Sequence, residues 1–463
     1  MRQFTAQAVK QFGGNRSGSF AIMMAMVLAA LTLSAGYAVN LAQLYNVRSA
    51  LRQALDSAVT STARDITTGV IVVDDARSWV ELFLKTNGAL TIMDGERIVL
   101  DRIAVDRVQG TLEASAYVDV ALYFPLFGAD SEKRVRSESA SLYSDRKIEV
   151  AMMLDVTDSM SGSKIRDLKT AASNAVDALT KHQSKTNPRV RIALVPYSDG
   201  VNVGALAKDV VFVEKAGGYD LPPPVDAKKA EIDANTGAWT DTCATERKSA
   251  DLKADFSDDA PDAKRVRLID GKEREYLARV NRDDRLNSCA KAVLKPLSDD
   301  AEALKKQIQD FSVAGYTAGA TGVQWTYYML SRNWRTAIRN AGLGDGPADA
   351  DPRNVAKIAI LMTDGEFNTA HADVVGDKTV VRKQNAKSRS YAEALCDNMK
   401  KDGIEVFTIG FKLNSSAARA VLKNCASPDT GSLKRYYETS SGEELNEAFL
   451  TIARNIEALV LTQ

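Results

Sequence analysis

The sequence predicts an α/β protein: a doubly wound, mainly parallel sheet that follows an N-terminal transmembrane helix, a helical stalk and a small β-rich spacer. Three patterns predict this organisation. A long charge-free stretch lies near the N-terminus, short segments of alternating polarity follow it, and apolar strands alternate with helices from residue 147 onward. Strands that alternate with helices imply a parallel sheet covered on both faces. A chain of 463 residues is also long enough for two or three folded units.

The charge-free stretch predicts a membrane span. No residue between Arg16 and Arg48 is charged, and the apolar part is long enough to cross a bilayer as a helix, which we place at 19–42. Basic residues precede it and no acidic residue occurs before Asp56, so the positive-inside rule places the tail, 1–18, in the cytoplasm and the rest outside. A cleaved signal peptide is the alternative, although its apolar core would be unusually long.

The helical pattern continues beyond the span and predicts an amphipathic stalk helix over 43–66. Its apolar residues recur at helical spacing: Leu44, Val47, Leu51, Leu55 and Val59. This apolar face could pack against the next domain of the same chain or against a partner helix at the membrane, and the pattern alone allows both.

Residues 67–146 read as a small β-rich spacer. Polar and apolar residues alternate, which is typical of strands, and Asn87-Gly88 and Asp94-Gly95 are turn signals. Strands are predicted over 71–73, 97–105, 111–123 and 135–143. The segment contains no group of residues that suggests catalysis.

Residues 147–463 carry the alternating pattern of the main domain. Strands are predicted over 148–154, 189–197, 356–362, 405–411 and 435–438, and helices over 164–181, 299–311, 319–331, 382–401, 415–424 and 442–458. The alternation is broken over 199–295, a segment with many charges, the run Leu221-Pro222-Pro223-Pro224 and few apolar runs. We interpret it as a long insertion that lacks apolar residues to anchor it.

The four cysteines predict two disulfide bridges. Cys243 and Cys289 both fall in the insertion, and Cys396 and Cys425 flank the strand predicted over 405–411. Bridges within each pair are expected in an oxidising compartment, and the first would tie down the insertion. No CxxC spacing occurs and the chain has two histidines, which argues against a zinc site.

Overall charge argues against nucleic-acid binding. The chain has 60 basic and 60 acidic residues, and no basic block is interleaved with aromatic residues.

Oxygen-bearing side chains follow two of the predicted strands and precede one helix. They lie in three segments: Asp155-x-Thr157-x-Ser159, Gly315-Tyr316-Thr317, and Thr363-Asp364-Gly365-Glu366. Strand ends of a parallel sheet meet at one edge, so these segments can converge there. Carboxylates and hydroxyls without His or Cys suit a hard divalent cation, with Mg²⁺ as the expected ion and Mn²⁺ or Ca²⁺ as alternatives. A structural alternative is that the first segment only caps the following helix.

These segments carry a resemblance. Asp155-Val156-Thr157-Asp158-Ser159 resembles the D-x-[ST]-x-S signature of von Willebrand factor A domains, which implies a doubly wound sheet of that type and a metal-ion-dependent adhesion site. By position, the metal-site residues that the resemblance implies are Asp155, Thr157, Ser159, Thr317 and Asp364. The family implies a binding module in which a protein partner donates a carboxylate to the metal. Asp158 departs from the family, where Gly is frequent.

The wider arrangement is similar to the TadG-like proteins of tight-adherence (Flp-type) pilus assembly. The matching features are the helix Tyr45 to Arg64, the Trp239-Thr240-x-x-Cys243 loop, Cys289, Lys295-Pro296-Leu297-Ser298 and Trp325. This resemblance implies a single-pass protein of the bacterial inner membrane with most of the chain in the periplasm, and other pilus-assembly envelope proteins as partners. Met23 stands where a pilin-like segment would carry Glu, which argues against prepilin-type cleavage at Gly18.

Two other functions would use the same residues. Phosphatases of the haloacid dehalogenase type place an Asp after the first buried strand, but their second carboxylate follows two residues later, where this chain has Thr157. Proton transfer then has no candidate group at the right reach, so we expect no enzyme. The second alternative is a structural envelope protein with a non-functional metal site.

Overall fold

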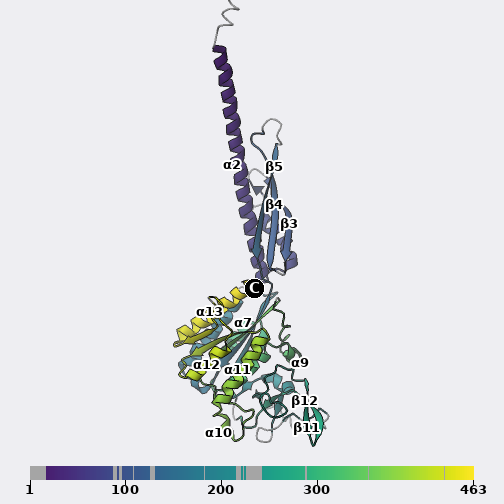
Figure 1. The fold of residues 1–463 in the computed structure, drawn as a ribbon, viewed down its shortest axis with the longest axis vertical. Coiled ribbons are helices and arrows are strands. Elements are labelled where there is room, and N and C mark those ends of the chain that lie inside the picture. Colours follow the sequence, from purple (N-terminus) through teal and green to yellow (C-terminus); the bar gives the residue numbers. More distant parts are fainter. Residues whose placement is uncertain are drawn as a thin grey trace, which may run out of the picture. The chain divides into compact units, whose positions relative to one another are not determined.

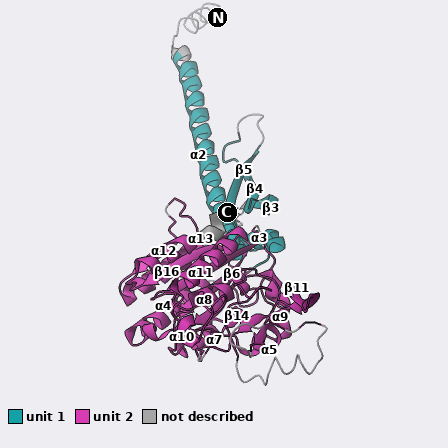
Figure 2. Ribbon diagram, turned by 60° about the horizontal axis from the view of Figure 1, so that its bottom comes forward, with its two compact units in different colours: residues 1–67, 71–144 teal, residues 68–70, 145–463 magenta. Residues whose placement is uncertain are grey.

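The chain forms two compact units. Unit 1 comprises Met1–Thr67 and Ile71–Ser144, and unit 2 comprises Thr68–Val70 and Asp145–Gln463, coloured separately in Figure 2. The structure is a computed structural model and describes residues 17–86, 91–92, 96–107, 109–125, 131–181, 183–214, 221–222, 224–225, 242–286, 289–352, 354–431 and 433–462.

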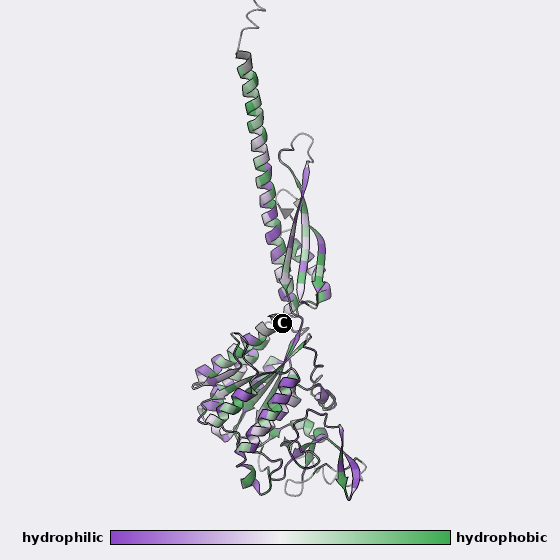
Figure 3. Ribbon diagram, in the orientation of Figure 1, coloured by the Kyte–Doolittle hydropathy of each residue, from purple (hydrophilic) through white to green (hydrophobic). Residues whose placement is uncertain are grey.

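One continuous helix, α2 (Ser17–Thr67), covers both the predicted span and the predicted stalk (Figure 1). Its 51 residues extend over about 75 Å at 1.5 Å per residue. Among the described residues it is the one helix that is long and apolar enough to cross a membrane, and 6% of its most apolar window is buried. In Figure 3 the first part of α2 is mostly hydrophobic and the second part is mixed.

The second part of α2 belongs to the core of unit 1. Val47, Leu51, Leu55 and Val59 are fully buried against a three-stranded antiparallel sheet of order β3-β4-β5. The apolar face of the stalk therefore packs against the next module of the same chain. The strands are β3 (Val99–Asp106), β4 (Thr111–Ala121) and β5 (Glu132–Leu142), with the short pair β1 (Thr91–Ile92) and β2 (Glu96–Arg97) beside them.

The strand predicted over 71–73 is wrong. Val73–Asp75 forms a 3₁₀ turn that leads into an unpredicted helix, α3 (Ala76–Thr86). The β-branched run before Asp74 suggested a strand, but it is short and two acidic residues at a helix N-terminus favour the helix through its dipole. Ala76, Val80 and Leu84 are buried at helical spacing. The turn signals at 87–88 and 94–95 lie outside the described residues.

Unit 2 contains the predicted doubly wound, mainly parallel sheet. Its order is β14-β7-β6-β15-β16-β17, and every pair is parallel except β14 with β7. The strands are β6 (Lys147–Asp155), β7 (Val190–Tyr197), β14 (Lys295–Ser298), β15 (Val355–Thr363), β16 (Glu405–Phe411) and β17 (Tyr436–Thr439).

Helices cover both faces of this sheet. Met152 and Leu154 of β6 pack on the face of α4, α7 and α13, whereas Ala151 and Met153 pack on the face of α8 and α11. A strand buried on both faces explains why β6 reads as a continuous apolar run. The helices are α4 (Ser163–Thr180), α5 (Ala207–Val210), α7 (Ala301–Gln309), α8 (Gly319–Tyr328), α9 (Arg335–Asn340), α10 (Lys378–Val381), α11 (Asn385–Lys401), α12 (Ser416–Cys425) and α13 (Gly442–Thr462).

Strand β14 was not predicted, and it contains Pro296. β14 lies at the edge of the sheet with an irregular register between Lys295 and Ser298, where a missing backbone N–H is tolerated.

The insertion packs into the core of unit 2, so the expectation that it lacks an apolar anchor is wrong. Val201, Leu206, Val210 and Val280 are fully buried in the cluster that contains α8. Apart from the short run Val210-Val211-Phe212-Val213, the buried apolar residues are spread along the segment. Both predicted disulfides, Cys243–Cys289 and Cys396–Cys425, are present. The strands of the insertion are β8 (Val201–Asn202), β9 (Val211–Val213), β10 (Cys243–Ala244), β11 (Lys264–Ile269), β12 (Lys272–Leu277) and β13 (Val280–Arg282).

Candidate metal centre

The carboxyl ends of two adjacent central strands define the site. β6 and β15 are neighbours in the sheet, but β7 follows β6 on its other side. The chain order therefore reverses between β6 and β15, and ligands of open α/β sheets bind at such a switch point. Asp155 ends β6, and Asp364 follows Thr363, the last residue of β15.

A line of short hydrogen bonds joins the first and third predicted segments. The Thr157 hydroxyl donates to Asp155 Oδ1 over 2.6 Å, and the Ser159 hydroxyl donates to Asp364 Oδ1 over 2.6 Å. The two hydroxyl oxygens lie 2.8 Å apart. Four of the five predicted metal-site residues are thus in direct contact.

The fifth residue, Thr317, lies beside them. A Cβ added to Gly365 would lie 3.6 Å from Thr317 Oγ1 and 3.7 Å from Ser159 Oγ, so both hydroxyls face the same point. The backbone joins the loops as well, because the Asp158 N–H donates to the Gly315 carbonyl oxygen over 3.0 Å. The structure therefore brings all five predicted residues together.

The first segment does not cap the following helix. Helix α4 begins at Ser163 with Gly162 at its N-cap position, and no side chain caps it. Asp155, Thr157 and Ser159 bond to one another and to the end of β15 instead. Capping therefore does not explain why these residues occur together.

Asp155 is a completely buried carboxylate. Besides Thr157, it accepts hydrogen bonds at Oδ2 from the Tyr197 hydroxyl over 2.9 Å and from the Thr363 hydroxyl over 2.7 Å. Burial, and then repulsion by Asp364, raise the pKa of Asp155 to about 6, although the bonds from Thr157 and Thr363 oppose the rise. Burial also raises the pKa of Tyr197 well above its usual range, so Tyr197 is a neutral donor.

The arrangement fits a divalent cation. A hydroxyl that gives its one proton to a carboxylate keeps its lone pairs for another partner, and the hydroxyls of Thr157 and Ser159 both do so. The two neighbouring carboxylates repel each other, and the Lys164 ammonium balances one of them at 2.5 Å from Asp364 Oδ2. An ion of charge +2 would neutralise the remaining repulsion, and oxygen ligands are those that Mg²⁺ and Mn²⁺ prefer.

Three side chains that the sequence did not point out position Thr317. Asn368 binds the backbone of Thr317 on both sides: its Oδ1 accepts the Thr317 N–H over 3.1 Å, and its N–H donates to the Thr317 carbonyl over 3.0 Å. The buried Asp199 accepts the Tyr316 N–H over 2.5 Å and pairs with Arg382 over 2.8 Å. These bonds fix the loop that carries Thr317.

Glycine is required at the start of that loop. Gly315 has φ +76°, and an added Cβ would lie 3.2 Å from Asp199 Cγ. Any other residue would be strained there and would push against the carboxylate that holds Tyr316.

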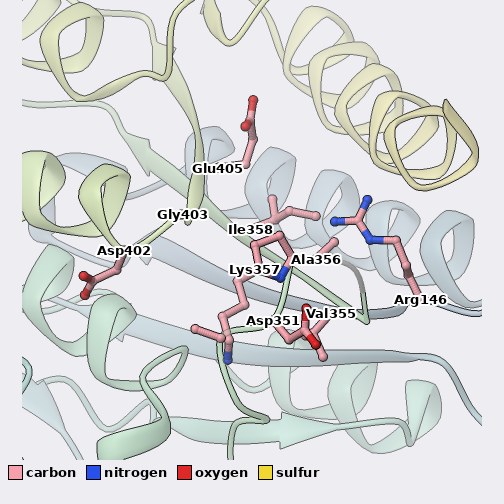
Figure 4. A pocket seen from close by; sticks show the side chains of 11 residues that line it. Arg146, Asp351, Val355, Ala356, Lys357, Ile358, Asp402, Gly403 and Glu405 are labelled. Carbon is pink, nitrogen blue, oxygen red and sulfur yellow. The ribbon is translucent and has the colours of Figure 1, made fainter. Parts of the chain in front are cut away.

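Two other polar features of unit 2 do not make comparable sites. Glu214, Asp283 and Asp284 have carboxylate oxygens within 4.8 Å of one another, but the Lys248 ammonium bonds both Glu214 and Asp283. A cavity of about 110 Å³ lies near the first residues of β15 and β16, at the opposite end of the strands, and Figure 4 shows the side chains that line it. It is therefore separate from the oxygen cluster.

Comparisons with known proteins give likenesses of structure. No family model matches the sequence, and no curated protein does. The pilus adhesin SpaC from Lactobacillus rhamnosus GG in its open conformation matches at 11% identity and TM-score 0.36, over 80% of this chain and 36% of SpaC. The vWF domain of the type V pili tip protein Mfa5 from Porphyromonas gingivalis matches at 12% identity and TM-score 0.34, over 68% of this chain and 96% of that domain.

A third similar structure is proximal thread matrix protein 1 from the mussel byssus, with a zinc-occupied MIDAS motif, at 15% identity and TM-score 0.31, over 68% of this chain and 46% of that one. Of the pilus adhesin SpaC, this chain spans about a third of the length. Because these TM-scores are low, the geometry of the site, and not these likenesses, supports the function proposed next.

Proposed function

We propose that this chain is a membrane-anchored envelope protein of tight-adherence (Flp-type) pilus assembly or surface adhesion, and that unit 2 binds a protein partner through a metal-ion-dependent adhesion site. One observation carries the proposal. Side chains from three distant segments, Asp155 to Ser159, Thr317 and Asp364, meet as oxygen ligands at the switch point of the sheet.

The protein side chains have separate roles at this site. The hydroxyls of Thr157, Ser159 and Thr317 would face the ion, and Asp155 would orient Thr157 while supplying negative charge. The bound ion would offer an open coordination position to a carboxylate of the partner. Ser159 is exposed, so an acidic side chain of another protein can approach this edge.

The same geometry disfavours the phosphatase. A nucleophilic carboxylate must reach its substrate, but Asp155 is completely buried and both of its oxygens accept hydrogen bonds from protein groups. Thr157, two residues later, cannot serve as a general acid or base at neutral pH.

α2 and the cysteines support a place in the cell envelope. We place α2 across the bacterial inner membrane with its N-terminus in the cytoplasm, as the basic residues before it favour. Unit 2 would then lie in the periplasm, an oxidising compartment that suits its two disulfides. Other envelope proteins of pilus assembly are the expected partners.

The test combines metal binding with attachment. Calorimetric titration of Mg²⁺ and Mn²⁺ into the full chain in detergent should show binding. Thr317→Ala should weaken this binding at least tenfold, because the hydroxyl that would face the ion is lost. Thr170→Ala is the matched control, since its hydroxyl bonds the Arg166 carbonyl within α4, away from the site. In cells, Thr317→Ala should abolish surface attachment at normal protein level.

The structural alternative makes the opposite prediction. If the envelope protein has a non-functional metal site, Asp155→Ala and Thr317→Ala leave attachment intact whenever the protein accumulates normally. Attachment at the wild-type level by Thr317→Ala would therefore refute the proposed function.

A further inference from the structure

We infer that unit 1 makes a second contact with the membrane: the segment that leaves β4, Ala121 to Pro125, lies at the lipid–water interface against the end of the α2 span. This segment is called the β4 tip below. The inference rests on the proposed transmembrane placement of α2, and adds to it a lipid surface as the partner of the β4 tip.

The buried stripe of α2 extends into the apolar span. Beyond the apolar core residues from Val47 onward, the same face of the helix continues through the buried residues Gln43, Asn40 and Gly36, which are spaced by three and four residues. A Cβ added to Gly36 would lie 3.4 Å from Phe124 Cβ, so the side chain of Phe124 packs beside this position of the helix. The face of α2 that packs on the rest of unit 1 thus begins inside the stretch expected in lipid.

Two amide side chains bind the backbone of the β4 tip. Asn40 donates to the Phe124 carbonyl over 2.7 Å and accepts the Phe124 N–H over 3.1 Å. Gln43 donates to the Ala121 carbonyl over 2.8 Å and accepts the Tyr123 N–H over 3.3 Å. In water such backbone groups can bond to solvent, but near hydrocarbon an unsatisfied group costs several kcal/mol. The amides supply the partners that a backbone segment at the membrane needs.

The length of the span places these contacts at its outer end. Within the span placed at 19–42, the almost wholly apolar part Phe20 to Val39 crosses about 30 Å of hydrocarbon as a helix, so Asn40, in the last turn of the span, lies at the outer border. Gly36 is one turn deeper, about 6 Å along the axis. Phe124, which packs beside Gly36 and whose backbone is bound by Asn40, therefore lies level with the edge of the hydrocarbon.

Exposed aromatic side chains of α2 and of the β4 tip gather around this level, beside the exposed Glu132 of β5, which pairs with Ala121. Tyr37 and Tyr45 on α2 are 56% and 75% exposed, and Tyr123 and Phe124 on the β4 tip are each 51% exposed. Aromatic residues gather at both membrane interfaces, where the ring meets apolar chains and the polar end meets water. Residues 121–125 carry no charge. Their exposure, which would be unfavourable in water, is explained by a lipid surface.

Spin labels test this placement in the full chain. All four native cysteines are in disulfides, so a single added cysteine is the one free thiol. The variants Phe124→Cys, Leu31→Cys and Leu142→Cys are labelled in vesicles of phosphatidylcholine and phosphatidylglycerol. Leu31 and Leu142 are 60% and 61% exposed and serve as references within the span and at the far end of β5. Power saturation with oxygen and a water-soluble nickel chelate reports lipid or water around each label.

We expect the label at 124, like that at 31, to be several-fold more accessible to oxygen than to the nickel chelate, and the label at 142 to show the reverse. A lipid-exposed label at 31 with a water-exposed label at 124 would overturn the inference alone. Water exposure at 31 as well would overturn the transmembrane anchor and the inference together. A nickel- and oxygen-shielded label at 124 would indicate a protein partner in place of lipid and would also overturn it.

A second variant guards against disruption by the label at 124. Tyr123→Cys places the label on the neighbouring exposed residue, where the same preference for oxygen is expected. When Asn40→Ala and Gln43→Ala are added to the Tyr123→Cys variant, the β4 tip should be released and the nickel accessibility of the label at 123 should rise several-fold. The same two changes added to the Leu142→Cys variant should leave the accessibility of the label at 142 unchanged. No rise would show that the amides do not position the tip.

Discussion

Replacement of Asp155 by asparagine removes a buried negative charge while it keeps the size of the side chain. The pKa of Asp155 is about 6 instead of 3.8, and a tenfold change in proton affinity corresponds to about 1.4 kcal/mol. At pH 7 the ionised carboxylate therefore lowers the free energy of unfolding by about 3 kcal/mol when no metal is bound. Asparagine keeps one oxygen to accept from Thr157, and the hydroxyls of Tyr197 and Thr363 can turn to accept from its amide.

We expect Asp155→Asn to unfold at higher urea in the presence of a chelator, with a gain of about 1 to 3 kcal/mol at pH 7. The sign of the pH dependence follows from the raised folded-state pKa: wild-type stability from this group is fully present below pH 4 and is lost as the pH rises through 6. The advantage of the variant should therefore shrink to zero between pH 7 and pH 4.

The assay is urea unfolding of the full chain in detergent, followed by the fluorescence of Trp325 and Trp334, which are fully buried in unit 2. Asp345→Asn, at an exposed position, is the control and should change stability little at any pH. A loss of stability in Asp155→Asn at pH 7, or an advantage that does not vary with pH, would refute the reasoning, because the carboxylate would then be a structural group.

Three further changes are predicted. Asn368→Ala removes the side-chain acceptor of the Thr317 N–H and should weaken Mg²⁺ binding about 10-fold in calorimetry, whereas Asn398→Ala, which loses a bond to the Phe256 carbonyl, should not. Leu51→Ala should destabilise unit 1 by about 3 to 5 kcal/mol, and this loss should be seen as faster hydrogen exchange in β4. Tyr45→Ala, at an exposed position, is the control. Equal exchange in the two variants would show that Leu51 is not part of the core of unit 1. Replacing Cys396 and Cys425 together by Ala opens a loop with a sequence separation of 29. This change should lower the free energy of unfolding by about 3 to 4 kcal/mol, measured by urea unfolding under oxidising conditions. An unchanged free energy of unfolding would mean that the bridge does not form in solution.

The sheet was predictable because its strands are local patterns. β6, β15 and β16 are apolar runs with polar residues at both ends, and each parallel strand is followed by a helical period. Strand β14 was missed because it has four residues and is stabilised by its pairing with β7 at a sheet edge, which no local pattern shows. Helix α3 escaped because a β-branched run precedes it, although its buried residues have helical spacing.

The site was predictable only in part for a similar reason. The metal-site residues form short patterns, whereas the residues that position Thr317 act across long distances in sequence: Asp199 lies 117 residues from Tyr316 and Asn368 lies 51 residues from Thr317. One signal was available. Asp199 follows β7 by two residues, so it comes to the same edge of the sheet as Asp155.

The three segments hold one another, so a metal ion at the proposed site would be coupled to the stability of unit 2. Asp158 binds the loop of Thr317 through its backbone, Asn368 binds Thr317 from the segment after β15, and Ser159 binds Asp364. The charge on Asp155 opposes this assembly by about 3 kcal/mol at pH 7. A cation at 100 times its Kd stabilises the folded state by about 2.7 kcal/mol. A cation at the proposed site would therefore offset a large part of the cost of the buried charge, and unit 2 would be more stable with the metal bound than without it.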